Sequence, residues 1–250
     1  MFETLLSPIE LGTLKLKNRI IFAPTSMGLP EDEYFKKMED IAAGGCAMII
    51  IGDVPVLPTV FGHSLYSKKG FAHYQKLTEI VHRHGCLICA QLHQSDANLK
   101  GMIKYIPGVL CKKIKPQELR PLLNAQVAPY ISNLTVKKIK KIITAFGDSA
   151  VLAQKAGFDM VQVHGDRMCG SFSSAVFNHR TDAYGGSAEN RFRFAVEAVS
   201  AIRAKLSDYP IDFKLVVRQE EPHYGNAGVL NEDLIFLCRF WKKPVSPASM

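Results

Sequence analysis

The regular alternation of short β-branched runs with longer amphipathic segments constrains this sequence more than any other feature. Five runs are predicted to form strands, at residues 19–23, 47–51, 87–92, 160–164 and 213–218. Four segments with helical periodicity lie between them, at residues 31–43, 71–84, 136–156 and 188–206. Strand-then-helix units in series are typical of a parallel sheet whose faces are covered by helices. The sequence therefore predicts an α/β fold.

Two α/β architectures fit such a series, a TIM barrel and a doubly wound open sheet. The third, fourth and fifth predicted strands end in polar residues, Gln91, His164 and Arg218. In a TIM barrel, the carboxyl ends of several strands together build the active site. No G-x-G-x-x-G motif follows the first strand, which argues against a dinucleotide-binding open sheet. We therefore predict a (β/α)8 TIM barrel, of which this chain carries about five of the eight β/α units.

Composition and charge bear on the partners that the chain can have. Its 250 residues are 47% hydrophobic and 22% charged, as in an ordinary globular protein with one core. Much of the net charge of +8 comes from the lysines of segments 112–115 and 137–141. The second segment occupies the polar face of a predicted helix whose other face carries Val136 and Ile139. We therefore predict no nucleic-acid partner, although this charge suits an anionic substrate.

The apolar runs and the cysteines indicate a cytoplasmic location. The longest apolar run, 47–51, is far too short to span a membrane, and the N-terminus has no signal-peptide pattern. Six cysteines in a chain of this length do not form a disulfide scaffold. Cys86 and Cys89 form a C-x-x-C pair, but no second pair or nearby histidine completes a zinc site. We predict a cytoplasmic protein with no membrane partner and no metal site.

A long motif after the fourth predicted strand points to a family. Residues 178–194 read N-x-R-T-D-x-Y-G-G-S-x-x-N-R-x-R-F, which resembles the signature of the Old Yellow Enzyme family. Shorter matches lie at residues 16–20, 23–25, 91–92 and 217–218. The resemblance covers residues 5 to about 230. It implies a TIM barrel that binds FMN and takes electrons from NADH or NADPH.

The resemblance assigns flavin-binding roles to residues at the strand ends. In the family, the loop after the first strand passes beside the flavin. The corresponding residues here are Ala23, Pro24, Thr25 and Ser26. The Ser26 hydroxyl can donate to the flavin O4, the Gln91 amide suits the pyrimidine ring, and Arg218 would place a cation near N1 and O2. The alternatives are that Thr25 and Ser26 cap the next helix and that the others are buried structural residues.

The segment after the fourth strand departs from the family's usual pattern. His164 matches the first of two side chains that hold a substrate carbonyl in the family, but Arg167 takes the place of the second. Donors there stabilise the enolate-like charge that develops on the substrate, and Arg167 brings a permanent positive charge. Cys169 stands where the family often has a proton-donating tyrosine, so Asp166, a water or, less suitably, Cys169 is the candidate donor. The alternative reading of Asp166 and Arg167 is a loop ion pair.

The tetrad H-G-D-R at 164–167, followed by M-C-G-S, narrows the resemblance further. It is similar to the bilirubin-reducing branch of this family in anaerobic gut bacteria. The positive charge of Arg167 suits the propionates of bilirubin, and the segment 93–132, with Lys100, Lys104, Lys112 and Lys113, is predicted to be a long loop that covers a large ligand. Two alternatives stay open, namely a general 2-enoate or 2,4-dienoyl reductase and a non-catalytic fragment.

The last residues depart from the barrel pattern. Residues 1–238 match the N-terminal two-thirds of an FMN-binding barrel, whereas 239–250 break both the helical and the strand pattern. Synonymous codons permit a shifted frame that reads ILEEAGVSCID, which is a helix end, a glycine stop and the start of a strand. We therefore predict a frameshifted tail and a chain that, as written, lacks the family's phosphate-binding loops and fails to hold FMN. An iron–sulfur cluster is expected only in a longer form.

Overall fold

The structure is a computed structural model that divides into two compact units. It describes residues 2–59, 62–96, 105–111, 125–215 and 231–242, and the single positions 113, 115, 118, 121, 122 and 229. The first unit comprises residues 1–94, 141–164 and 198–214, and the second comprises 95–140, 165–197 and 215–250. The main sheet therefore lies wholly in the first unit, and the motif at 178–194 lies wholly in the second.

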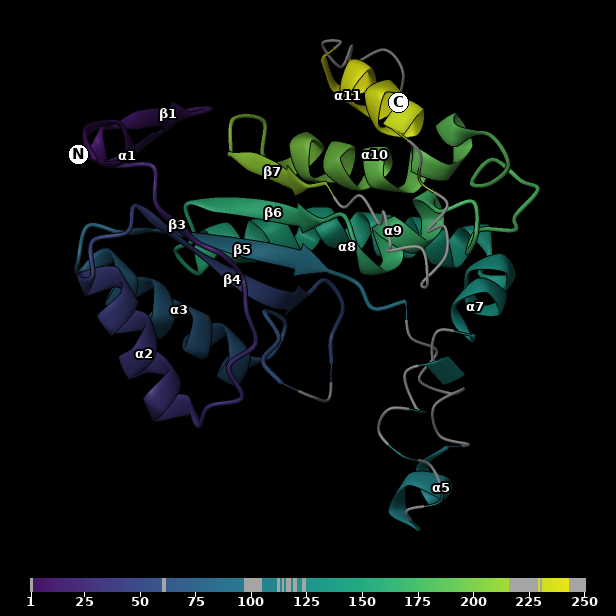
Figure 1. Ribbon diagram of the computed structural model, residues 1–250, viewed down its shortest axis with the longest axis horizontal. Helices are drawn as coiled ribbons and strands as arrows, with labels where there is room; N and C mark the ends of the chain where they lie inside the picture. Colours follow the sequence, from purple (N-terminus) through teal and green to yellow (C-terminus); the bar gives the residue numbers. More distant parts are fainter. Residues whose placement is uncertain are drawn as a thin grey trace. The chain divides into compact units, whose positions relative to one another are not determined.

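Five parallel strands lie side by side in the sheet of the first unit (Figure 1). They are β3 (Ile21–Phe22), β4 (Met48–Pro55), β5 (Leu87–His93), β6 (Met160–His164) and β7 (Ile211–Lys214). Each strand pairs with the next one in the sequence, as in a barrel, and the order does not reverse as it does in a doubly wound sheet. The predicted barrel-type sheet is confirmed as five strands of an incomplete (β/α)8 barrel.

The long helices begin and end close to the predicted positions. They are α2 (Glu31–Ala43), α3 (Lys68–His82), α8 (Val136–Lys155) and α10 (Ala188–Lys205). In α2, the buried residues Phe35, Met38 and Ala42 follow the helical period and form one stripe. The Ser67 hydroxyl caps α3 by accepting a hydrogen bond from the Gly70 N–H at 3.0 Å. Helices α2 and α3 lie on the same face of the sheet (Figure 1).

The predicted apolar face of α8 is confirmed except at its first residue. Ile139 and Ile142 are buried, whereas Val136 is 47% exposed. Val136 is the first residue of α8, so no preceding helical turn covers its side chain.

The first unit also contains a short hairpin that the sequence analysis did not predict. After α1 (Glu3–Leu6), the strands β1 (Ile9–Leu11) and β2 (Leu14–Leu16) pair in antiparallel fashion. Gly12 lies in the turn between them with a φ of 60°, a conformation that glycine adopts at little cost. The buried Leu16 packs in one apolar cluster with residues from the amino-terminal halves of the sheet strands.

The second unit contains four further helices in the described part of the chain. They are α5 (Ile106–Leu110), α7 (Val127–Asn133), α9 (Arg167–Ser173) and α11 (Asn231–Lys242). The prediction of a long loop over 93–132 was therefore wrong, because α5 and most of α7 lie inside it. Lys100, Lys104 and Lys112 lie outside the described residues. Of the predicted aberrant segment 239–250, the residues up to Lys242 continue α11 and the others are outside the described residues. No described helix is both long and apolar enough to cross a membrane.

Side chains of the motif at 178–194 donate hydrogen bonds to backbone carbonyl groups inside the second unit. The Asn178 amide donates to the carbonyl oxygens of Phe172 and Tyr184, each at 2.6 Å. The Arg180 guanidinium donates to the carbonyl oxygens of Ile131 and Leu134, each at 2.7 Å, at the end of α7. These side chains bond carbonyl groups at the ends of α9 and α7 and in the loop at Tyr184, so the motif ties these segments of the second unit together.

Candidate active site

One face of the sheet is built from an apolar row followed by a polar row. The apolar row consists of Ile50, Cys89 and Met160, which the strand register aligns across β4, β5 and β6. The polar row lies two residues nearer the carboxyl ends and consists of Gln91, Gln162 and Asp212. Because strand side chains alternate between the two faces, residues two apart share a face. The polar row therefore lies on the same face as the apolar row, toward the end of the sheet where barrel enzymes place their chemistry.

Hydrogen bonds join the polar row into a chain. The Gln91 Nε2 donates to Gln162 Oε1 at 2.5 Å, and the Gln162 Nε2 donates to Asp212 Oδ2 at 2.5 Å. Gln91 is only 2% exposed, so this contact holds its amide in one orientation. A primary amide has two N–H groups and a carbonyl oxygen, and the bond to Gln162 uses one N–H.

Gly52 leaves a cradle beside the Gln91 amide. A Cβ atom placed on Gly52 would lie 3.1 Å from the Cβ of Pro24 and 3.8 Å from Oε1 of Gln91. Any side chain at this position would therefore fill the space that lies between the loop after β3 and the amide. Gln91 and Pro24 were both predicted to contact the flavin, and the structure brings them to the two sides of one glycine. An open cradle with an oriented amide fits the polar edge of a flavin pyrimidine ring.

The loop after β3 carries the other predicted flavin contacts. Ala23, Thr25 and Ser26 are exposed, and the Ser26 hydroxyl donates to Asp53 Oδ2 at 3.4 Å. The reading of Thr25 and Ser26 as helix caps is wrong, because α2 begins at Glu31 and no side chain caps it. Asp53 follows Gly52 where the pairing of β4 with β5 shifts register, so an irregular strand end directs its carboxylate toward the loop.

The residues after β6 combine burial with backbone strain. His164 is a buried residue at the end of β6, two positions beyond Gln162 and on the same face. Asp166 is half-buried and precedes α9, and Arg167 is exposed and begins that helix with a φ of 53°. Among the described non-glycine residues, Arg167 and Asp53 are the two with positive φ. Such strain costs on the order of 1–3 kcal/mol and clusters at functional sites.

The comparison with known families decides what kind of protein carries this arrangement. The model of the NADH:flavin oxidoreductase / NADH oxidase family matches residues 4–222. This chain belongs to that family. The match includes β3 to β7 and all the predicted site residues, so the polar row lies in the part of the chain that defines the family.

The family relatives include proteins of known activity and solved structure. The chain is 58% identical over 239 residues to a bilirubin reductase of Clostridium symbiosum, covering 95% of this chain and 64% of the relative. It is 32% identical to a bilirubin reductase of Mediterraneibacter gnavus, covering 96% of this chain and 38% of that protein. The chain thus spans between about a third and two-thirds of the length of these relatives. An Old Yellow Enzyme from a Pichia species superposes with a TM-score of 0.68 at 24% identity, over 84% of this chain and 58% of that chain, which shows the same fold.

Two further residues singled out from the sequence are Arg218 and Cys169, and the structure describes only the second. Arg218 lies outside the described residues. Cys169 is buried in the second unit, and burial, with a smaller contribution from the Asp166 charge, raises the pKa of its thiol to about 12. A thiol with so high a pKa is a weak acid at neutral pH, which disfavours Cys169 as a proton donor.

Four residues of the candidate site were missed from the sequence. Asp212 stands one position before the predicted strand 213–218, whereas the observed strand β7 begins at Ile211. Gln162 could have been found, because it lies two positions before His164 in the same strand and so shares its face. Gly52 and Asp53 had no such signal. Asp53 stands out because the pairing of β4 with β5 shifts register there, and Gly52 stands out because Pro24 lies close to it. The register shift and the position of Pro24 are features of the tertiary structure.

Proposed function

We propose that this protein reduces bilirubin in an FMN-dependent reaction at the carboxyl end of the barrel. The observation that carries the proposal is the 58% identity to a bilirubin reductase over 95% of the chain. Bilirubin is a linear tetrapyrrole whose bridging carbons are conjugated to lactam carbonyls. It therefore offers both the activated double bonds that a flavin reductase needs and the propionates that a basic protein binds.

The flavin would be held by Ala23, Pro24, Thr25, Ser26, Gln91 and Arg218. The Gly52 cradle supports this assignment, because it leaves room between Pro24 and the oriented amide of Gln91. Bound FMN would supply reducing equivalents that come from NADH or NADPH. In this arrangement, Gln162 and Asp212 are positioning residues that fix the rotamer of Gln91.

His164, Arg167 and Asp166 would act on the substrate. His164 donates a hydrogen bond to a lactam carbonyl, and Arg167 binds a carbonyl or a propionate with a charge-assisted bond. Both contacts become stronger as negative charge develops on the carbonyl oxygen. Asp166 either supports Arg167 or delivers the proton to carbon. Asp166 or a water remains the proposed proton donor.

Replacing Arg167 by alanine tests the substrate assignment in the protein expressed from its complete gene. We expect the rate of bilirubin reduction to fall by about one to three decades, equivalent to about 2–4 kcal/mol of transition-state stabilisation. The measurement is the anaerobic loss of bilirubin absorbance with NADH or NADPH. Flavin content should stay unchanged, since Arg167 is assigned to the substrate.

The matched control is Arg83→Ala, which removes the same charge from an exposed position directly after α3. Its rate should equal that of the unmodified protein. Normal turnover of bilirubin by Arg167→Ala would refute the role of Arg167. Reduction of simple enoates with no activity on bilirubin would instead favour the general enoate reductase.

A further inference from the structure

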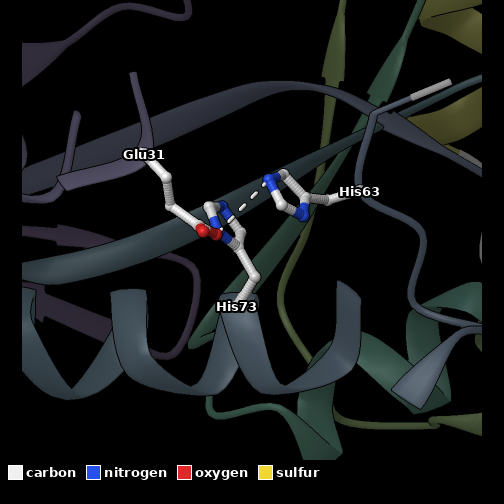
Figure 2. A group of neighbouring side chains, drawn as sticks. All are labelled: Glu31, His63 and His73. Carbon is white, nitrogen blue, oxygen red and sulfur yellow. Dashed lines mark hydrogen bonds and ion pairs between the residues drawn. The ribbon is translucent and has the colours of Figure 1, made fainter. Parts of the chain in front are cut away.

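Glu31, His63 and His73 converge at a place that the proposed reaction does not use (Figure 2). Glu31 is the first residue of α2, His63 lies in the segment between β4 and α3, and His73 is on α3. Nδ1 of His73 lies 2.7 Å from Oε1 of Glu31, and Nε2 of His63 lies 3.6 Å from the same oxygen. One ligand atom from each residue lies within 4.8 Å of the other two. All three residues belong to the first unit.

His73 is held rigidly by its surroundings. Its side chain is buried on α3, with the Phe35 ring at 4.9 Å and the Tyr74 ring at 5.4 Å between centroids. The His63 ring stacks on it at 3.5 Å with an interplanar angle of 8°. A buried imidazole enclosed by rings keeps few rotamers, so His73 presents its nitrogen in a fixed direction.

The segment that carries His63 is tied to the start of α3. A Cβ atom on Gly70 would lie 2.2 Å from the carbonyl oxygen of Ser64, so the backbone after His63 approaches the helix where only glycine fits. The Tyr74 hydroxyl also donates to the His63 carbonyl oxygen at 3.3 Å. The backbone of His63 is therefore fixed, while its half-buried side chain keeps freedom to turn about its side-chain bonds.

The geometry points to a binding site for a divalent transition-metal ion of the zinc class, with Glu31, His63 and His73 as protein ligands and water completing the shell. Two imidazoles and one carboxylate form a donor set that suits Zn²⁺. Two ligands at about 2.0–2.1 Å from a tetrahedral ion are separated by about 3.3 Å. The observed separations of 2.7 and 3.6 Å lie on either side of that value. Binding then requires the His63 ring to leave its stacked position and turn its nitrogen toward the ion.

Metal ions bind an ionised carboxylate and an imidazole nitrogen that carries no proton. A bound ion would therefore replace the hydrogen bond between Nδ1 of His73 and Oε1 of Glu31, and both atoms would become ligands.

A bound ion would join two helices near the flavin loop. Glu31 starts α2 at the end of the loop that holds Ala23 to Ser26, and His73 belongs to α3. An ion between them would fix the far end of that loop to α3. The inference rests on the cluster alone and is independent of FMN and bilirubin.

Metal titration of the protein tests the inference. The exposed Cys111 and Cys238 are first replaced by serine, so that their thiols do not bind the ion. Zn²⁺ should then bind at one saturable site and raise the melting temperature. Co²⁺ at the same site should give the visible absorption of a four-coordinate ion. Glu31→Gln and His63→Ala should each weaken Zn²⁺ binding by at least about tenfold.

The control is His84→Ala, which removes a histidine that faces a single carboxylate, with Nε2 of His84 3.5 Å from Oε1 of Glu39. This variant should bind Zn²⁺ like the parent, because a pair of ligands does not make a zinc site. Both Glu31 and His63 have partly exposed side chains, so their variants are expected to fold. Absence of saturable Zn²⁺ binding, or unchanged binding in both variants, would overturn the inference.

Discussion

The apolar row and the polar row of the sheet differ in chemistry although they share a face and stand two residues apart. The apolar row, Ile50, Cys89 and Met160, is buried with Leu16 and Met48 in one cluster. The polar row, Gln91, Gln162 and Asp212, is held together by side-chain hydrogen bonds. The first stabilises the sheet by removing apolar surface from water, and the second uses buried polar groups whose orientation matters.

This difference teaches that stability and chemistry are separated along the strands. A change in the apolar row should affect the free energy of unfolding much more than the site. A change in the polar row should affect flavin binding as well as stability. The four predictions below test this separation in the protein expressed from its complete gene.

The largest effect is expected from Met48→Ala in the apolar cluster. Met48 is fully buried, so truncation leaves a cavity that should lower the free energy of unfolding by about 2–5 kcal/mol. Urea unfolding followed by circular dichroism measures the loss. Leu29→Ala, at an exposed position, should cost far less. Equal losses in the two variants would show that the cluster does not stabilise the sheet.

A smaller loss of stability, accompanied by a change at the site, is expected from Gln162→Leu. The substitution leaves the buried Gln91 amide without its acceptor, which should cost about 1–3 kcal/mol of unfolding free energy. Because Gln91 is no longer oriented, FMN retention should also fall. Gln154→Leu, on the exposed side of α8, is the control for both measurements. Full FMN retention in Gln162→Leu would mean that the polar row is purely structural.

Gly52→Ala is expected to weaken flavin binding with little loss of stability. The added methyl group would enter the cradle beside Pro24 and Gln91, and we expect about tenfold weaker FMN binding, equivalent to about 1.4 kcal/mol. Fluorescence titration of the flavin-free protein measures it. Gly44→Ala meets a similarly close backbone atom, at 3.2 Å, at the end of α2 and serves as control. FMN affinity that is equal in the two variants would place the flavin elsewhere.

The smallest effect concerns a polar contact near the amino end of the sheet. Asp159 accepts hydrogen bonds from His82 at 2.9 Å and from the Ile88 N–H at 2.7 Å, and the hydrogen bond from Asp159 raises the pKa of His82 above its ordinary value of 6.5. A raised pKa in the folded state stabilises the protein below pH 6.5, and this stabilisation is lost as the pH rises through the raised value.

His82→Gln should therefore lower the melting temperature more in mildly acidic than in alkaline buffer. Since His82 is partly exposed, the effect should stay below about 1 kcal/mol. Bilirubin turnover should not change, because this contact belongs to the amino end of the sheet. A pH-independent difference in melting temperature would rule out a charged pair.

The sequence predicted most of the first unit because its signals are local. The range 31–43 for α2 and the range 160–164 for β6 agree with the structure, since both depend on a short apolar period and on nearby glycines. The motif at 178–194 was enough to assign the family. The catalytic and flavin-binding residues stay predictions, and so does the frameshift proposed for 239–250.

Other features could not be read from the sequence because they depend on contacts between distant segments. The C-x-x-C pair gave no hint that Cys86 lies beside Cys46, with the two sulfur atoms 3.6 Å apart. The segment 93–132 contains α5 and most of α7, whereas its prolines and lysines are typical of a loop.

The amino-acid sequence by itself determined the succession of the five parallel strands and the four long helices, the family, and the polar residues Gln91 and His164 near the ends of their strands. Only the tertiary structure decided that Gln91 is oriented by Gln162, that Gly52 opens a cradle, and that Glu31, His63 and His73 meet. The physical reason is that hydrophobic periodicity is a property of the residues of a single helix or strand, so the sequence shows it directly. A site depends instead on the register between strands and on the path of the loops, which bring distant residues together.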